Sequence, residues 1–155
     1  MKNYKQKVIE PTNHNRDFTP PPVTKYMVPR RDLITFQPDT EISDVVKTLL
    51  KHKITGAPVL DAKGALLGLI DDKDCIKVLM DAVYYNNMQR MTVANYTTNV
   101  MKTISDKANV VEVANEFSRT IYKRLLVVNK EGELVGQISR QDILQAISDY
   151  SKNIF

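Results

Sequence analysis

An internal duplication constrains the fold of this chain more than any other feature of its sequence. When the sequence is displaced by 68 positions, residues 34–74 align with residues 102–142 without a gap, and eight of the 41 aligned positions are identical. About two identities are expected by chance at ordinary composition. The identical positions gather around glycines and around the terminal aspartates, Asp74 and Asp142. Such self-similarity indicates two copies of one structural unit.

Both copies predict the same order of elements, strand–helix–strand–strand–helix. The expected elements are short strands at 34–36 and 102–104, helices beginning near 42 and 110, strands at 57–60, 66–70, 125–128 and 134–138, and closing helices from about Lys73 toward Met91 and over 143–150. Thr40 or Ser43 is expected to cap the first helix. The turns between the hairpin strands end at Gly64 and Gly132, where a positive φ is readily adopted.

We define copy 1 as residues 34–91 and copy 2 as residues 102–155, so that each includes its closing helix. Neither unit of about 55 residues can bury much core alone, so the two are expected to pack against each other. The predicted fold class is therefore α+β, with two β-α-β-β-α repeats forming one module. The expected boundaries are a basic, proline-containing leader over 1–22, a first repeat over 23–91 and a second repeat over 92–155.

The net charge of +4 is confined to the N-terminal part of the chain. Residues 1–32 contain seven Lys and Arg against three acidic residues, whereas residues 33–155 contain 15 of each. The remainder is therefore neutral, and we interpret the basic leader as a solvated arm rather than an anion-binding one. No apolar run approaches the ~20 residues of a membrane span, and the N-terminus has no signal-peptide pattern. The single Cys75 cannot form an intrachain disulfide, which predicts a reducing, cytoplasmic location.

The two copies resemble the CBS domain, as found in cystathionine beta-synthase. The resemblance runs from Met27 to Asp74 and from Val100 to Ile143, where the order and spacing of the hairpin and its terminal Asp recur. It implies a two-lobed disc with two clefts related by a pseudo-twofold axis. It also implies a module that binds AMP, ADP or ATP, or less readily S-adenosylmethionine, requires no cofactor, and forms a homodimer through its helices. Such modules regulate other proteins or domains, so an unidentified regulated partner is expected.

A motif at the end of copy 2 contains the first candidate binding residues. The segment from Gly136 to Asp142 matches the family motif Gly-h-h-Ser/Thr-x-x-Asp, where h is apolar. By resemblance, Asp142 and Ser139 bind a ribose, with Ile138 beside them. Ser139 and Asp142 also have the spacing of a helix capping box. The two interpretations are compatible, because a helix N-terminus presents free N–H groups that favour an anion.

Copy 1 departs from this motif. Asp71 replaces the hydroxyl residue, and Asp72 adds another carboxylate before Asp74. Three carboxylates in four residues would repel a phosphate in a cleft of low dielectric constant. A metal site is disfavoured, because the Asp-Asp-Lys-Asp order lacks alternating ligands and a calcium-loop glycine. We expect helix capping and solvation of these carboxylates instead.

A second difference between the copies precedes each central strand. Copy 2 has Lys123 and Arg124 where copy 1 has Thr55 and Gly56. The basic pair resembles the phosphate-contacting residues in the gamma subunits of AMP-activated protein kinase, and Arg suits bidentate contacts with phosphate. Arg140, at the start of the closing helix, adds a third cation. A solvated basic pair is the alternative interpretation.

Three further expectations concern single residues and surfaces. Thr103 is a weaker candidate for contact with the adenine or the ribose, and its alternative is a buried strand threonine. Cys75 is expected to be a buried thiol rather than a redox sensor. Apolar residues beside the core stripes of the closing helices predict a homodimer interface. They are Cys75, Val78, Tyr84, Tyr85, Met88, Ala146 and Ile154.

The sequence favours a function without catalysis, because it contains no P-loop, GxSxG, HExxH or GxGxxG motif. The leading hypothesis is a regulatory module that binds an adenine nucleotide. The second is a constitutive dimeric interaction protein with vestigial clefts, which the altered motif of copy 1 supports. The third is association with nucleic acid through residues 1–32, which only their charge supports.

Overall fold

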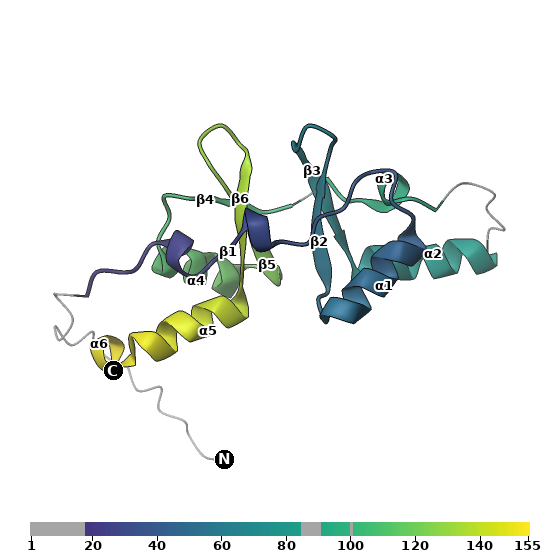
Figure 1. The fold of residues 1–155 in the computed structure, drawn as a ribbon. Helices are drawn as coiled ribbons and strands as arrows, with labels where there is room; N and C mark the ends of the chain where they lie inside the picture. Colours follow the sequence, from purple (N-terminus) through teal and green to yellow (C-terminus); the bar gives the residue numbers. More distant parts are fainter. Residues whose placement is uncertain (1–17, 85–90, 100) are drawn as a thin grey trace, which may run out of the picture.

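The computed structural model describes residues 18–84, 91–99 and 101–155. The fold is α+β, as predicted, and has two lobes that are each built on a β-hairpin and two helices (Figure 1). The hairpins stand next to each other in the middle of the molecule, and the helices of the two copies lie toward opposite ends (Figure 1). None of the helices in these ranges has the length and apolar character needed to cross a bilayer.

The elements largely follow the predicted order. Copy 1 contains α1 (Ile42–His52), β2 (Gly56–Leu60), β3 (Leu66–Asp71) and α2 (Asp72–Tyr84). Copy 2 contains β4 (Thr103–Ser105), α4 (Val110–Arg119), β5 (Arg124–Val128), β6 (Leu134–Ser139), α5 (Arg140–Asp149) and α6 (Ser151–Ile154). The strand predicted at 34–36 is reduced to one parallel bridge between Phe36 and Val59, whereas its counterpart β4 forms a parallel ladder with β5. The predicted extension of the first closing helix toward Met91 crosses 85–90, outside the described residues.

The start of α1 differs from the prediction. The helix follows Glu41, which makes no side-chain cap, so the expected caps Thr40 and Ser43 are wrong. The N–H of Ile42 instead donates to Met91 O at 2.9 Å, so a distant part of the chain fixes where the helix begins. In copy 2 the equivalent residue, Asn109, caps α4 by accepting from two N–H groups of the first turn.

The two hairpins have the same register. β2 pairs antiparallel with β3, β5 pairs antiparallel with β6, and both ladders slip just before their last residue pair. Their turns contain the two glycines that were expected to have positive φ, Gly64 at 83° and Gly132 at 80°. A side chain would be strained in this conformation, which explains why both copies have glycine here.

The segment that precedes each copy packs against the other copy. Residues 23–28 include the short helix η1 (Val23–Lys25) and lead into β1 (Val28–Pro29), which pairs with β6 of copy 2 before η2 (Arg30–Asp32) follows. Residues 93–98 include α3 (Val93–Tyr96) and bridge to β3 of copy 1. The N–H of Val23 donates to copy 2 and that of Val93 to copy 1, both at 2.9 Å. We call residues 23–28 and 93–98 the exchanged segments, since each completes the lobe on the other side.

A tyrosine fastens each exchanged segment to a closing helix. Tyr26 and Tyr96 each lie three residues after the buried valine of their segment. The hydroxyl of Tyr26 donates to Asp149 Oδ2 at 2.7 Å, and that of Tyr96 donates to Asp81 Oδ2 at 2.8 Å. The two aspartates are themselves 68 positions apart. The duplication therefore extends beyond the segments that align without a gap.

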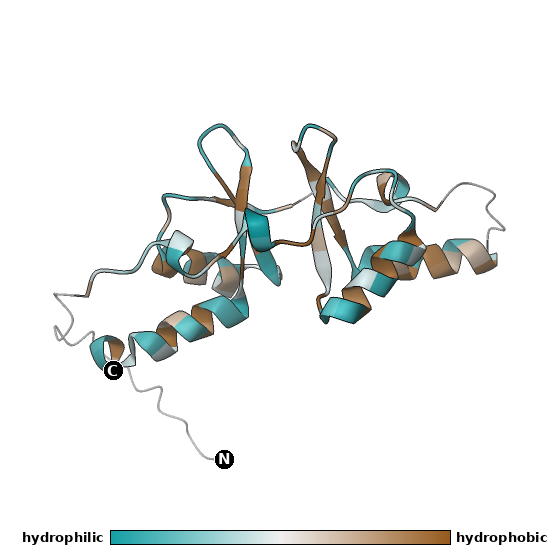
Figure 2. Cartoon of the chain, viewed as in Figure 1, coloured by the Kyte–Doolittle hydropathy of each residue, from teal (hydrophilic) through white to brown (hydrophobic). Residues whose placement is uncertain are grey.

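Three apolar clusters make up the core. One cluster consists of residues of copy 1 together with Val93, and another of residues of copy 2 together with Val23. The third joins the hairpins through Leu60, Leu126 and Leu134. Hydrophobic residues follow the strands, and further ones lie on the outer helices (Figure 2). Because the third cluster draws on both copies, burial of its side chains holds the two lobes together as one module.

Candidate functional site

The predicted phosphate-binding pair lies where the two copies meet. Arg124 is the first residue of β5, and its guanidinium reaches copy 1, where it donates to Thr55 Oγ1. The position equivalent to Arg124 in copy 1 is Gly56. A Cβ atom on Gly56 would collide with the guanidinium of Arg124 and would lie 2.9 Å from Ile70 O. The glycine of copy 1 therefore makes room for the arginine of copy 2.

This junction contains a cleft of about 200 Å³, which we call the junction cleft. Its lining comes from the end of β3, the start of α2 and the residues that lead into β5: Leu69, Asp71, Asp72, Lys73, Ile121, Tyr122, Lys123 and Arg124. Lys123 Nζ lies 4.0 Å from Asp72 Oδ2. Burial lowers the pKa of Arg124, while the charges of Asp71 and Asp72 oppose this change. The junction cleft thus combines basic and acidic side chains from both copies.

The motif of copy 2 forms a capping box, as its spacing predicts. The N–H and hydroxyl of Ser139 donate to Asp142 Oδ2 at 2.8 and 3.0 Å, and Asp142 N donates to Ser139 Oγ at 3.4 Å. Arg140 is the first residue of α5, and its Nη2 donates to Thr120 O at 3.5 Å. The ribose-binding role of this motif stays a prediction, with which the capping geometry is compatible.

Of the predicted site residues, only Lys123 and Arg124 line the junction cleft. Ser139, Arg140 and Asp142 do not, although Ser139 is the strand partner of Arg124. Ile138 and Thr103 lie outside the cleft as well. Ile138 is fully buried in the core of copy 2, so only its backbone could contact a ligand. Thr103 is exposed on β4, so the alternative of a buried strand threonine is wrong. It lines a separate cleft of about 330 Å³, together with Glu112 and Glu116 of α4. The structure therefore brings Lys123 and Arg124 together but places Thr103 in other surroundings.

The acidic motif of copy 1 repeats the geometry of the capping box with carboxylates alone. Asp71 N donates to Asp74 Oδ2 and Asp74 N donates to Asp71 Oδ1, both at 3.0 Å. Asp74 is only 6% exposed. Burial raises the pKa of Asp74 to about 6; the N–H bond from Asp71 opposes the rise, and the negative charge of Asp71 adds to it. Within the described parts of the chain, no three His, Cys, Asp or Glu side chains are grouped as metal ligands.

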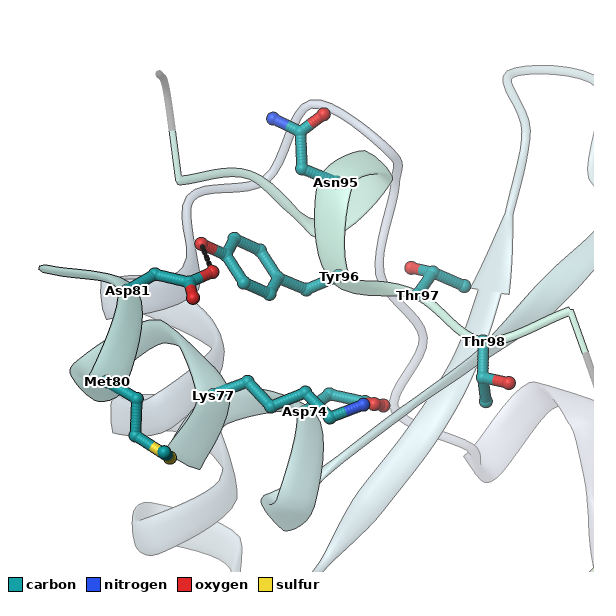
Figure 3. Close-up of a pocket in the computed structure, with 8 residues that line it drawn as sticks. All are labelled: Asp74, Lys77, Met80, Asp81, Asn95, Tyr96, Thr97 and Thr98. Atoms are coloured by element: carbon teal, nitrogen blue, oxygen red, sulfur yellow. Dashed lines mark hydrogen bonds between the residues drawn. The ribbon is translucent and has the colours of Figure 1, made fainter. Parts of the chain in front are cut away.

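A larger cleft, of about 540 Å³, lies beside copy 1, where no ligand was predicted. It opens between α2, which contributes Asp74 and Lys77, and the exchanged segment 93–98 (Figure 3). The hydrogen bond between Tyr96 and Asp81 joins its two walls (Figure 3). Sequence reasoning missed this cleft because one wall comes from a segment outside the aligned copies. The recurring Val-x-x-Tyr pattern of the exchanged segments is the signal that could have revealed it.

The helix surfaces expected to form a homodimer differ between the lobes. On copy 1, the side chains of Leu50, Leu79 and Val83 are 74%, 66% and 68% exposed. On copy 2, Phe18 and Pro21 of the leader lie against α4 and α5, and together they line an apolar groove of about 120 Å³. Phe18 and Pro21 thus pack on the helices of copy 2, and the described helices of copy 1 present the larger exposed apolar surface.

The residues predicted for the dimer interface are only partly available. Tyr84 is exposed, but Ala146 is buried in the core of copy 2 and cannot contact a partner, so that part of the prediction is wrong. Ile154 lines the apolar groove of copy 2. Tyr85 and Met88 lie outside the described residues.

Cys75 and Val78 pack partly against the core of copy 1. The thiol of Cys75 is half-buried rather than fully buried. Burial, followed by the nearby negative charges of Asp74, Asp71 and Asp72, raises the pKa of Cys75. A raised pKa keeps the thiol protonated, which disfavours the thiolate that a redox sensor requires.

Comparisons with known proteins agree with this architecture. The family model described as CBS domain matches residues 23–81 and 93–149. The chloroplastic CBS domain-containing protein CBSX2 of Arabidopsis thaliana is 25% identical over 148 residues, which cover 80% of this chain and 62% of that protein. A CBS domain-containing protein of Dictyostelium discoideum is 31% identical over 125 residues, covering 76% of this chain and 86% of the relative.

The solved structure of CBSX2 in complex with AMP has a TM-score of 0.76 and 26% sequence identity, covering 84% of this chain and 98% of the other. This chain spans less than two thirds of the full length of CBSX2. The two ranges that the family model matches begin at the exchanged segments, at Val23 and Val93. They include both lobes and most of the residues, and the chain therefore belongs to the CBS-domain family, as a tandem pair of CBS domains.

Proposed function

We propose that this chain is a regulatory module that binds a phosphate-bearing adenine nucleotide, AMP, ADP or ATP, and catalyses no reaction. The observation that carries the proposal is the position of Lys123 and Arg124 in a cleft between the two copies, with Lys73 contributed by copy 1. Converging positive charges lower the free energy of a bound phosphate. The AMP complex of CBSX2, at 26% identity, supports an adenine nucleotide as the ligand.

The motif at the start of α5 would hold the ribose. The capping box uses Oδ2 of Asp142, so Oδ1 can accept from a ribose hydroxyl without loss of the cap. Ser139 orients that carboxylate, and Arg140 adds positive charge beside the free N–H groups of the first helical turn. Thr103 and the backbone of Ile138 are the remaining proposed contacts.

Regulation requires a partner protein that responds to the bound nucleotide, and we propose that the module acts in the cytoplasm as a homodimer. The exposed apolar surface of α1 and α2, with Leu50, Leu79 and Val83, is the proposed dimer contact. S-adenosylmethionine is a weaker candidate ligand, because its cationic sulfonium gains nothing from the basic pair.

A constitutive dimeric interaction protein is the second candidate. The observation that favours it is the presence of Asp71 and Asp72 in the junction cleft, where they offset two of the three positive charges. The basic leader, on which association with nucleic acid would depend, lies mostly outside the described residues, so that third hypothesis gains no support.

Calorimetry with AMP, ATP, adenosine and S-adenosylmethionine separates the first two candidates. We expect AMP or ATP to bind more tightly than adenosine, and the preference to shrink as salt screens the charges. Asp142→Ala should weaken nucleotide binding by roughly tenfold to a hundredfold, because a ribose hydroxyl loses its carboxylate acceptor. Asp74→Ala is the matched control, since it removes an equivalent cap from copy 1 and should change affinity little.

Three results would contradict the proposal or its assignment of the site. Equal affinity of the unmodified chain for adenosine and AMP would show that the phosphate makes no favourable contact. A complete lack of nucleotide binding would favour the constitutive interaction protein. A larger loss of affinity in Asp74→Ala than in Asp142→Ala would show that the ribose binds to copy 1 and that our assignment to copy 2 is wrong.

A further inference from the structure

The junction cleft contains its own anions. Lys73, Lys123 and Arg124 supply three positive charges and Asp71 and Asp72 supply two negative ones, so the cleft has a net charge of +1 at neutral pH. At the positions equivalent to the two aspartates, copy 2 has a serine and an arginine. The acids are thus specific to the copy whose residues face the basic pair of the other.

One residue anchors both the acidic and the basic side of the cleft. The N–H of Asp72 donates to Thr55 O at 2.9 Å. The guanidinium of Arg124 donates to the hydroxyl of the same Thr55. Thr55 is thus bonded both to the acidic segment of its own copy and to the first residue of β5 in the other copy. These two bonds keep the acidic segment close to β5.

The carboxylates are held in place by backbone bonds as well. Asp72 Oδ1 accepts from Lys73 N at 2.9 Å, while its Oδ2 faces Lys123 Nζ at 4.0 Å. Asp71 is fixed by its reciprocal bonds with Asp74, both 3.0 Å long. Both carboxylates therefore have defined positions beside the cations that a phosphate would use.

We infer that Asp72, supported by Asp71, competes with the ligand's phosphate for Lys123 and so determines how much negative charge the junction cleft accepts. The inference rests on the proposed function. Loose ion pairs between exposed side chains contribute little, so an incoming phosphate can draw the Lys123 side chain away from the Asp72 carboxylate, which stays in place. Each additional phosphate then meets two fixed carboxylates, whose repulsion is weakly screened at short range. The cleft accordingly favours a monophosphate over a triphosphate.

The substitution Asp72→Asn tests this inference, because it removes the charge and retains an oxygen that can accept from Lys73 N. Calorimetry at low ionic strength, without divalent cations, should give an affinity for ATP roughly three- to thirtyfold higher than that of the unmodified chain. The gain for AMP should be smaller. Asp44→Asn is the matched control, since Asp44 is an exposed acid in the first turn of α1 and does not line the cleft. It should leave both affinities unchanged.

A second variant tests whether the effect is competition for Lys123. In the Lys123→Ala background, the gain produced by Asp72→Asn should shrink, because the carboxylate no longer has a cation to withhold from the ligand. A gain of the same size in that background would show a general charge effect and would overturn the inference. The thermal unfolding midpoint of each variant checks that the fold is retained.

Inorganic tripolyphosphate and phosphate separate this inference from the proposed function, because neither contains adenosine. If the unmodified chain binds no nucleotide, the proposed function fails, and the inference is then decided by these two probes alone. It requires that Asp72→Asn bind tripolyphosphate more tightly than Asp44→Asn does. Equal binding of the probes by the two variants, including no binding by either, overturns it.

Discussion

The two copies share one arrangement of elements, but their side chains differ in size and charge at the junction. At the start of the central strand, copy 1 has Gly56 and copy 2 has Arg124; at the end of the hairpin, copy 1 has Asp71 and copy 2 has Ser139. These differences fit together in space, because the guanidinium of Arg124 lies over Gly56 and senses the charge of Asp71. Two arginines at this point would repel each other, and two glycines would leave it unfilled. The duplicated halves are therefore complementary at the junction.

The exchanged segments, in contrast to the junction, make the same contacts on both lobes. Tyr26 and Tyr96 are identical, bind equivalent aspartates, and follow equally buried valines. These contacts join each lobe to a segment from the other side of the sequence, so both are needed to complete the module. Symmetric contacts thus maintain the fold, while the asymmetric junction provides the cleft to which we assign the ligand.

We expect Gly56→Ala to have the largest effect on stability, because it breaks the complementarity of the junction. The new Cβ would meet the guanidinium of Arg124 and lie 2.9 Å from Ile70 O. Ile70 O is a backbone atom of the paired strand β3, so it cannot shift without disturbing the hairpin. Overpacking of this kind should lower the free energy of unfolding by about 2–3 kcal/mol, as measured by urea denaturation.

The double variant Gly56→Ala, Arg124→Ala sharpens this test. Removing the guanidinium should restore part of the loss, because only the contact with Ile70 O then remains. A coupling energy of about 1 kcal/mol or more between the two positions is expected. Additive effects would mean that the glycine and the arginine do not accommodate each other.

The hairpins and the capping box could be predicted because their determinants are local. Gly64 and Gly132 have the positive φ that their turns require, and the spacing of Ser139 and Asp142 is enough to form the box. The start of α1 could not be predicted locally. Its first N–H, that of Ile42, donates to the distant Met91 O, and no side chain caps the helix.

The junction cleft was only half predicted. The sequence difference between the copies identified Lys123 and Arg124 as a basic pair, but it did not predict the residues that copy 1 contributes to the cleft. The contact of Arg124 with Thr55 spans 69 positions and depends on the space left by Gly56, so no local pattern reveals it. That Asp72 faces Lys123 follows only from the packing of one copy on the other.

We expect the acidic motif of copy 1 to make stability depend on pH. The raised pKa of Asp74, about 6 against an ordinary 3.8, means that the folded state binds this proton more tightly than the unfolded chain does. The stabilisation is therefore fully present below about pH 4 and is lost as pH rises through about 6. Asp74→Asn imitates the protonated form, so it should raise the free energy of unfolding by about 1–2 kcal/mol at pH 7.5 and by much less at pH 4.

Asp142→Asn is the control for this prediction. Asp142 occupies the equivalent position in copy 2, but its partner Ser139 has a hydroxyl in place of the second carboxylate. The variant should therefore show no comparable gain at pH 7.5 in urea denaturation. Asp142 is also less buried than Asp74. Equal gains in the two variants would mean that neither the burial of Asp74 nor the nearby charge of Asp71 is responsible.

The smallest expected effect concerns the two tyrosines, whose loss tests the symmetry of the exchanged segments. Tyr26→Phe and Tyr96→Phe each remove one hydrogen bond to a carboxylate and retain the ring, so each should lower the thermal midpoint by a few degrees at most. Hydrogen exchange should locate the change, with faster exchange of the Val93 N–H in Tyr96→Phe and of the Val23 N–H in Tyr26→Phe. Because the two bonds occupy equivalent places, the shifts should be similar in size. A much larger loss from one variant, or faster exchange in the segment that was not altered, would show that the two exchanged segments do not contribute equally to the fold.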